Sequence, residues 1–574
     1  MAEGRGGAPL QVLAARIFLT KGGLRNMPDT ISSTTSPAIP RLPSNVADEF
    51  SGSQTTSAAS ALFHVHSIPP EILTCIFLWL ITLNPVLGPW GCVSSHTRLA
   101  WIVPATHVCA RWRAVAIENP CLWTEINHNT IGVEWALEMA RRACQAPIDV
   151  YTDADCMPLL DYVVKHIDHV RHLQLRDGSQ DNLTSVLARL NRPAPMLESV
   201  EIYCRSTSTL PTDLFANTTP RLRHVWLGDY YVSPNHTVLS ASLVSLKIHM
   251  RATDRTSPEY TNDELLDVLE QMPNLEILHL ETLPLPGLAS LGKSRSVSLL
   301  HLDVLRLEGG LSGCCRLAAS LDLPAHTSIR MICESFSNNG EDCHLLVPFI
   351  TERIAAAATI HPIEHLYVNG VWATFVRLSF GPLKAHTTQF SALPLDVAIR
   401  FPLPDSEVPR WFLESICAVL PLEELRTLSI FTGQESWFHP GHWQETLRPA
   451  KRVETVNVRG SAARHLVSSF SMESRAGEPP DEAPTLLFPA LKTLALWELL
   501  GIHDVAPGTP RSDEELAGAL ASRTPKAPLK TLKLLDCDVQ KKWIETFEAV
   551  VPTVIVDSDA RFPIPFLYRG SKHE

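Results

Sequence analysis

Apolar residues recur at helical spacing in three short segments between residues 67 and 126. The first opens with Ser-Ile-Pro-Pro-Glu, where a hydroxyl cap, prolines and a carboxylate suit a first helical turn. Residues 107–116 continue with Val108, Trp112 and Val115 on one helical face, and residues 119–126 start a third helix at Pro120. Sixty residues can bury only part of this apolar surface, so the pattern predicts a small helical docking module.

A second pattern, L-x-x-L-x-L with Val or Ile allowed, returns along the rest of the chain. Its eleven occurrences start at Val170, Leu197, Leu222, Leu243, Leu275, Leu302, Ile363, Leu425, Val453, Leu491 and Leu529. Most starts lie 21 to 38 residues apart, and gaps of 61 and 62 residues indicate hidden repeats, with 327–333 and 393–401 as candidates. Amphipathic segments such as 262–272, 513–522 and 543–550 predict helices between the strands.

Composition favours a soluble globular protein with 13 scattered cysteines and a net charge of -12. This charge gives no basic field for nucleic acid, and no apolar run is long enough to span a membrane. The cysteines form neither a zinc ribbon nor a disulfide framework, so we expect reduced thiols in the cytoplasm or nucleus. Residues 1–60 are predicted to be a disordered leader, with a transit peptide as an alternative.

The helical module resembles the F-box, in the form common in large protein sets of mushroom-type fungi. The resemblance rests on Ile-Pro-Pro-Glu-Ile-Leu-x-x-Ile-Phe, then Val-Cys-x-x-Trp-Arg, then Pro-x-Leu-Trp-x-x-Ile. It differs in starting with Ile-Pro and in carrying a long insertion at residues 84–104.

The resemblance implies docking to a Skp-type adaptor and, through it, to a cullin in a ubiquitin ligase. The residues expected to hold the adaptor are Pro69, Ile72, Leu73, Ile76, Phe77, Val108, Trp112, Leu122 and Trp123. The chain would then be a substrate receptor, with no catalytic residue, metal or cofactor of its own. A scaffold that acts outside any ligase is an alternative.

The repeated phrases resemble irregular leucine-rich repeats, whose periods are about 20 to 29 residues. The fold predicted is therefore α/β: a three-helix F-box at 66–126, a linking segment at 127–169, a leucine-rich-repeat-like solenoid at 170–556 and a tail at 557–574.

One segment offers a rival function, because residues 287–294 read Gly-Leu-Ala-Ser-Leu-Gly-Lys-Ser and match the P-loop expression. A P-loop needs a helix directly after it, and only seven residues separate Ser294 from the phrase at Leu302. The segment is therefore interpreted as a loop, with nucleotide binding through Lys293 kept as an alternative.

The substrate is expected on the exposed face of the repeat strands. The third, fifth and seventh positions of each phrase point away from the core and include His172, His224, His249, His365, Phe431 and Trp497. A protein substrate is predicted at Tyr203, Trp226, His279 and Tyr367, gripped near Trp226 and Tyr367, with affinity changing between about pH 7.5 and 5.5 through the histidines. The return loops and the 84–104 insertion are alternative sites.

Overall fold

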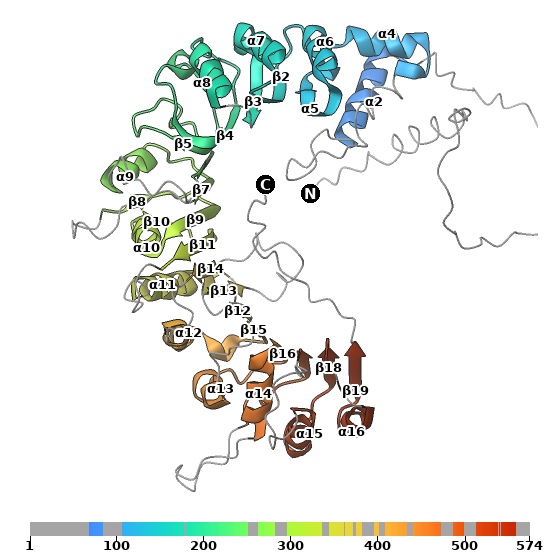
Figure 1. Ribbon diagram of the computed structural model, residues 1–574, viewed down its shortest axis with the longest axis vertical. Coiled ribbons are helices and arrows are strands. Elements are labelled where there is room, and N and C mark those ends of the chain that lie inside the picture. Colours follow the sequence, from blue (N-terminus) through green and yellow to red (C-terminus); the bar gives the residue numbers. More distant parts are fainter. Residues whose placement is uncertain are drawn as a thin grey trace, which may run out of the picture. The chain divides into compact units, whose positions relative to one another are not determined.

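The computed structural model describes residues 68–83, 106–176, 180–250, 262–281, 295–335, 344–360, 362–370, 375–381, 395–400, 408–432, 440–471, 486–498, 512–537, 539 and 541–557 (Figure 1). The chain divides into two compact units, Met1–Ala146 and Pro147–Glu574. We call them unit 1 and unit 2 and describe each by itself.

The helices predicted in unit 1 form close to the predicted positions, although the second starts at Ala110 and not at His107. Pro70 opens α2 (Pro70–Leu83), and Cys109 caps α4 (Ala110–Glu118) by accepting from the Trp112 amide. The third predicted helix is a single 3-10 turn, η2 (Pro120–Leu122), capped by Asn119. The chain then continues through β1 (Glu125–Asn127), α5 (His128–Ile131) and α6 (Val133–Ala143).

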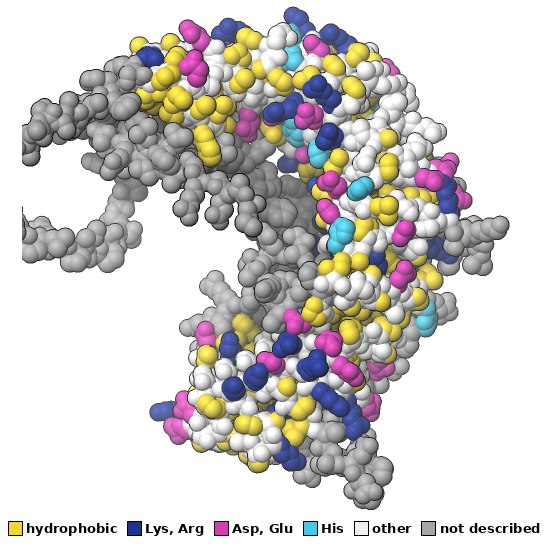
Figure 2. Space-filling view, turned by 180° about the vertical axis from the view of Figure 1, so that it is seen from behind, with side chains coloured by type: hydrophobic (Ala, Val, Ile, Leu, Met, Phe, Trp, Pro, Cys, Tyr) yellow, Lys and Arg dark blue, Asp and Glu magenta, His cyan; other side chains and the backbone are white. Residues whose placement is uncertain are grey.

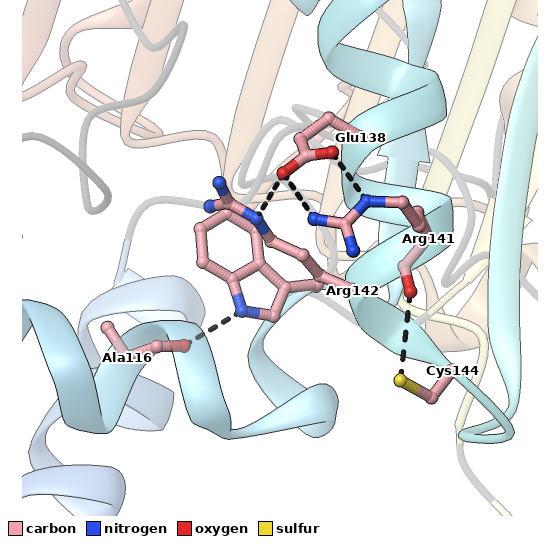
Figure 3. A network of polar contacts seen from close by, with 6 residues as sticks. Ala116, Glu138, Arg141, Arg142 and Cys144 are labelled. Carbon is pink, nitrogen blue, oxygen red and sulfur yellow. Dashed lines mark hydrogen bonds and ion pairs between the residues drawn. The ribbon is translucent and has the colours of Figure 1, made fainter.

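Aromatic side chains form the core of unit 1. The rings of Phe77 and Trp112 meet edge to face with centroids 5.4 Å apart. Trp123 is fully buried and donates its indole N–H to the Ala116 carbonyl at 2.8 Å (Figure 3). The Arg142 guanidinium lies 4.4 Å from the centre of the Trp123 ring and is bound by Glu138, so α6 is tied to this core.

Unit 2 is one long, mostly parallel sheet covered by helices on one face (Figure 1). Its first strands pair in chain order: β2 (Ile148–Asp153), β3 (Val170–Arg176), β4 (Ser199–Thr209), β5 (His224–Tyr231), β6 (Ser245–His249), β7 (Ile277–Glu281), β9 (Val304–Gly310) and β11 (Ser328–Glu334). Its last strands do the same: β15 (Thr427–Thr432), β16 (Thr455–Arg459), β17 (Thr493–Trp497), β18 (Thr531–Leu535) and β19 (Thr553–Asp557).

Helical returns link these strands, as predicted for a solenoid. They are α7 (Met157–Lys165), α8 (Gln180–Arg189), α9 (Asn262–Glu270), α10 (Leu311–Ala319), α11 (Leu346–Ala358), α12 (Val408–Val419), α13 (Pro440–Leu447), α14 (Ser461–Ser471), α15 (Ser512–Arg523) and α16 (Lys541–Val550). Short 3-10 turns replace or extend some returns, namely η3 (Ile167–His169), η4 (Leu214–Asn217) and η8 (Leu422–Glu424). A separate parallel pair, β8 (Val297–Ser298) with β10 (Leu321–Asp322), lies outside the main sheet.

The L-x-x-L-x-L phrases are confirmed as strands, because each of the eleven occurrences coincides with a strand of the main sheet. In β7, for example, Leu278 and Leu280 are fully buried while the residues between and beside them are partly exposed. The sheet starts earlier than the first phrase, since β2 and α7 belong to unit 2 and β2 pairs in parallel with β3.

The two long gaps between phrases contain the predicted strands at β11 and at β14 (Leu395–Arg400), but their arrangement differs from a simple repeat. After β11 the chain passes through α11 to β12 (His365–Gly370), turns back as β13 (Phe375–Gly381), and turns again into β14. Both β12 and β14 pair antiparallel with β13, so β14 lies beside β11 and β12 lies beside β15. The sheet stays continuous although its strand order reverses here.

Two buried arginines hold the loops that lead into strands. Arg353 of α11 donates to the carbonyls of Leu323 and Pro324 before β11, and Arg523 of α15 donates to the carbonyls of Leu487 and Phe488 before β17. Burial lowers the pKa of Arg523 to about 10. In both repeats a helix therefore binds the loop that precedes its own strand, and the guanidinium satisfies carbonyls that water cannot reach.

Replacing Arg523 tests this contact. Arg523→Met keeps the apolar stem but leaves buried carbonyls unpaired, so we expect a loss of about 1–3 kcal/mol in the free energy of unfolding. Arg452→Met is the matched control, because this exposed arginine only pairs with Glu424 and should contribute less than about 1 kcal/mol. Thermal unfolding of the full chain measures both, and equal effects would contradict the assigned role of Arg523.

Candidate functional site

We define the strand face as the face of the unit 2 sheet opposite the helices. Residue-for-residue pairing aligns equivalent positions in rows across the strands, with neighbours about 4.8 Å apart. The row at the fifth position of each phrase, which we call the central row, follows the strand register through the whole sheet. From β2 to β19 it contains Tyr151, Gln174, Glu201, Trp226, Lys247, His279, Arg306, Arg330, Asp396, Ser379, Tyr367, Ser429, Asn457, Ala495, Lys533 and Ile555.

Three of the predicted substrate residues gather within four neighbouring strands. Tyr203, Trp226 and His279 lie on β4, β5 and β7 and are partly exposed. The Tyr203 ring covers the backbone of Gly228 so closely that an added β-carbon would lie 2.2 Å from its Cδ2 atom. The Arg176 guanidinium lies 5.3 Å from the centre of the Trp226 ring. Figure 2 shows histidine, acidic and basic side chains together over these strands.

Tyr367 does not belong to this group, which corrects the predicted grip between Trp226 and Tyr367. Seven steps along the central row separate the two residues, roughly 30 Å at the spacing of parallel strands. Tyr367 and Phe431 are each only 7% exposed, and their ring centroids lie 5.4 Å apart. The alternation rule failed here because β12, β14 and β15 are buried on both faces.

Ion pairs follow the strand face from β6 to β13. His249 contacts Glu281 at 3.2 Å, Glu281 contacts Arg306 at 2.9 Å, and Arg306 lies 3.7 Å from Glu308. Beyond β11, Arg377 binds Asp396 through two hydrogen bonds of 2.8 and 2.5 Å, and Arg330 lies 3.4 Å from the same carboxylate. Ion pairs thus link side chains of neighbouring strands along this face.

The histidines of this face differ in their pKa values. Burial, together with the positive charge of Lys247, lowers the pKa of His279 to about 4, and burial also lowers the pKa of His172. The hydrogen bond to Glu281 raises the pKa of His249. His279 therefore stays neutral between pH 7.5 and 5.5, whereas the sequence analysis expected the histidines to gain a proton in this range. His249 differs from His279 because its pKa is raised.

The pair of His249 and Glu281 gives a pH dependence with a definite sign. Because the pKa of His249 is raised, its stabilising contribution is complete below the ordinary histidine value near 6.5 and is lost as pH rises through the raised value. The lowered pKa of Glu281 makes its own contribution disappear as pH falls through that lowered value.

We therefore expect Glu281→Gln to lower the pKa of His249 and to flatten the fall in stability above about pH 6.5. Histidine-selective NMR titration and thermal unfolding across this pH range measure the two effects. Asp303→Asn is the control, because Asp303 pairs with the exposed His326 elsewhere. A His249 pKa that does not move in Glu281→Gln would refute the pairing.

The residues predicted for adaptor docking in unit 1 divide into two groups. Leu73, Ile76, Phe77, Trp112, Leu122 and Trp123 are buried and pack within unit 1, whereas Pro69 and Ile72 are exposed and Val108 is intermediate. Substituting the buried group would disturb the core, so these residues position the helices. Among these residues, the exposed side chains are the ones that a partner can contact directly.

Helix α2 carries a second apolar stripe, of which the sequence analysis named Ile72 alone. Ile72 is 44% exposed, Trp79 is 54% exposed and Cys75 is exposed, and their i, i+3, i+7 spacing puts all three on one helical face. Glu71 is the sole charged residue of this helix. A helix that is apolar around most of its circumference is normally buried on all sides, so the exposed stripe is a candidate binding surface.

Several expected features lie outside the described residues: the leader at 1–60, the insertion at 84–104, the P-loop-like segment at 287–294 and the tail at 558–574. Within the described part of the chain, no group of three or more His, Cys, Asp or Glu side chains is arranged to hold a metal ion. None of the helices described there is long and apolar enough to cross a membrane. A cavity of about 540 Å³ between α12 and α13 is lined by glutamates and lies on the helix side of unit 2.

Comparison with known proteins gives a structural likeness alone. No protein-family model matches the chain, and no characterised protein matches it in sequence. Among solved structures, the leucine-rich repeat-containing protein LegL7 from Legionella pneumophila is 12% identical, with 68% of this chain and 93% of that chain covered at a TM-score of 0.23. Likeness at this level adds nothing to the account of function.

Proposed function

We propose that the chain is a binding subunit with two surfaces, in which unit 1 docks a Skp-type adaptor and the strand face of unit 2 holds a protein ligand. In this role it would be a substrate receptor of a cullin-RING ubiquitin ligase, located in the cytoplasm or nucleus, with no catalytic step of its own. The observation that carries the proposal is the exposed stripe of Ile72, Cys75 and Trp79 on a helix whose opposite face already fills a core.

The packing of unit 1 supports this reading. Leu73 and Phe77 of α2, with Trp112 of α4 and Trp123 after η2, complete a buried core without the exposed stripe. Two aromatic or aliphatic side chains left in water on one helical face are typical anchors of a protein interface. The F-box-like motifs supply the choice of partner, since they match the same helices.

Unit 2 supports the second surface. Its strand face is a continuous sheet that none of the described helices covers, and Tyr203 and Trp226 lie on it among paired charges. Aromatic residues beside charges of both signs suit a protein ligand better than a nucleic acid. The eleven cysteines within the described residues are all free, which fits a reducing compartment.

Two alternative functions, a scaffold outside any ligase and a nucleotide-binding protein, predict different experimental results. A scaffold that acts outside a ligase would bind the adaptor without cullin, so co-purification of cullin separates it from a substrate receptor. Nucleotide binding through Lys293 would give a magnesium-dependent affinity that Lys293→Ala removes.

Adaptor docking is tested by replacing the exposed stripe. We expect the full chain to bind a purified Skp-type adaptor and the double variant Ile72→Ser, Trp79→Ser to bind at least about tenfold more weakly, because two apolar anchors are lost. Trp135→Ser is the matched control, since Trp135 of α6 is an exposed tryptophan in the same unit and should leave adaptor affinity unchanged.

Circular dichroism and thermal unfolding confirm that each variant is folded. Absence of adaptor binding by the wild type, or equal binding by the double variant, would remove the adaptor from the proposal.

A further inference from the structure

Four successive positions of the central row carry basic side chains. They are Lys247 on β6, His279 on β7, Arg306 on β9 and Arg330 on β11. The row beside them on the amino-terminal side of the strands holds no charge, since it consists of Ser245, Ile277, Val304 and Ser328. A ligand that crosses these strands would therefore meet basic groups without acidic groups on that side.

The acidic side chains near the central row already form ion pairs or hydrogen bonds with basic side chains. Glu281 and Glu308 both lie against Arg306, which leaves the charge of Arg306 matched. Asp396 receives two hydrogen bonds from Arg377 and one from Ser379, so Arg330 shares a carboxylate that another arginine already neutralises.

Lys247 has no carboxylate within ion-pair distance among the described residues. Lys247 is therefore the unpaired cation among these four positions, and Arg330 shares Asp396 with Arg377. The side chain of Arg330 is 36% exposed, so a ligand can reach it.

The charges of this row also act on one another's pKa values. After burial, the charges of Lys247, Arg306 and Arg330 all lower the pKa of His279, and Glu281 alone opposes them. Burial and then the neighbouring guanidinium groups of Arg377 and Arg306 lower the pKa of Arg330, against the pull of Asp396 and Glu281. The potential over β7 to β11 therefore favours an anionic ligand.

Geometry sets the spacing of the ligand's charges. Lys247 and Arg330 lie three strand spacings apart, which is about 14 Å. An extended peptide advances about 3.4 Å per residue, so side chains four residues apart on one face also lie about 14 Å apart. Between them the ligand passes a neutral His279 and an Arg306 whose charge is matched.

We propose that the strand face from β6 to β11 binds an extended acidic peptide segment that crosses the strands, with one carboxylate at Lys247 and a second, four residues along, at Arg330. Trp226 lies on β5, one strand before Lys247, and can make an apolar contact with the peptide residue that precedes the first carboxylate. The inference rests on the proposed use of the strand face for a protein ligand, and it specifies the class of sequence that this face selects.

The test uses the full chain and three fluorescein-labelled nine-residue peptides in a Ser/Thr background. One peptide has two glutamates four residues apart, one has them two residues apart, and one has glutamines in their place. By fluorescence anisotropy we expect the first peptide to bind at least about fivefold more tightly than either of the others, because it alone reaches both cations.

Substitutions locate the contact. Lys247→Met and Arg330→Met should each weaken the first peptide at least about fivefold, whereas Arg330→Lys should retain most of the affinity because the charge remains. Lys533→Met is the matched control, since Lys533 occupies the same row on β18, and it should change nothing.

The possible results of these experiments distinguish a failure of this inference from a failure of the proposed ligase role. Equal binding of the two acidic peptides, or an equal loss in Lys533→Met, would show unspecific attraction and overturn the inference. Displacement by a single-stranded RNA of any sequence with the same dependence on Lys247 and Arg330 would also overturn it, in favour of a polyanion site. Adaptor binding without peptide binding would refute the inference alone, and peptide binding without adaptor binding would refute the ligase role alone.

Discussion

In-register parallel pairing is the constraint on which unit 2 depends. Each strand aligns residue for residue with the next, so leucine, isoleucine and valine at alternate positions form a continuous apolar layer under the helices. The same register decides which polar side chains become neighbours on the other face. Glu281 pairs with Arg306 because β7 and β9 are parallel neighbours, and Asp396 pairs with Arg377 because β14 and β13 are antiparallel neighbours.

The reversed strands β12 to β14 show how strongly this pairing holds. The chain skips two strand positions after β11, and the skipped positions are then filled by β14 and β13, so no strand of the series is left without a neighbour. Burial on both faces follows at β12 and β14, and several polar groups are satisfied internally, with Ser379 donating to Asp396 and Asn369 donating to the Tyr367 hydroxyl. Such satisfied networks make this part of the sheet a fixed structural element.

The sequence predicted the strands well because their signal is local. A phrase with apolar residues at its first, fourth and sixth positions specifies a strand and the loop before it, as Leu275 and the β7 residues Leu278 and Leu280 show. Strand order is not local, and nothing in the phrases could reveal that β14 precedes β12 in the sheet. The burial of Tyr367 and the pairing of Arg330 with Asp396 depend on that order, so both escaped prediction. In unit 1, helical spacing identified α2 but could not decide which of its two apolar faces, that of Leu73 or that of Ile72, lies in the core.

We propose that two separate surfaces, the exposed stripe of α2 and the strand face from β6 to β11, bind two different partners. Hydrogen–deuterium exchange on the full chain, with the adaptor or with the peptide bearing glutamates four residues apart, tests this claim most directly. We expect the adaptor to slow exchange within α2 while β6–β11 stays unchanged, and the peptide to slow exchange across β6–β11 while α2 stays unchanged. Protection of the same segments by both partners, or of neither surface by its own partner, would contradict the account.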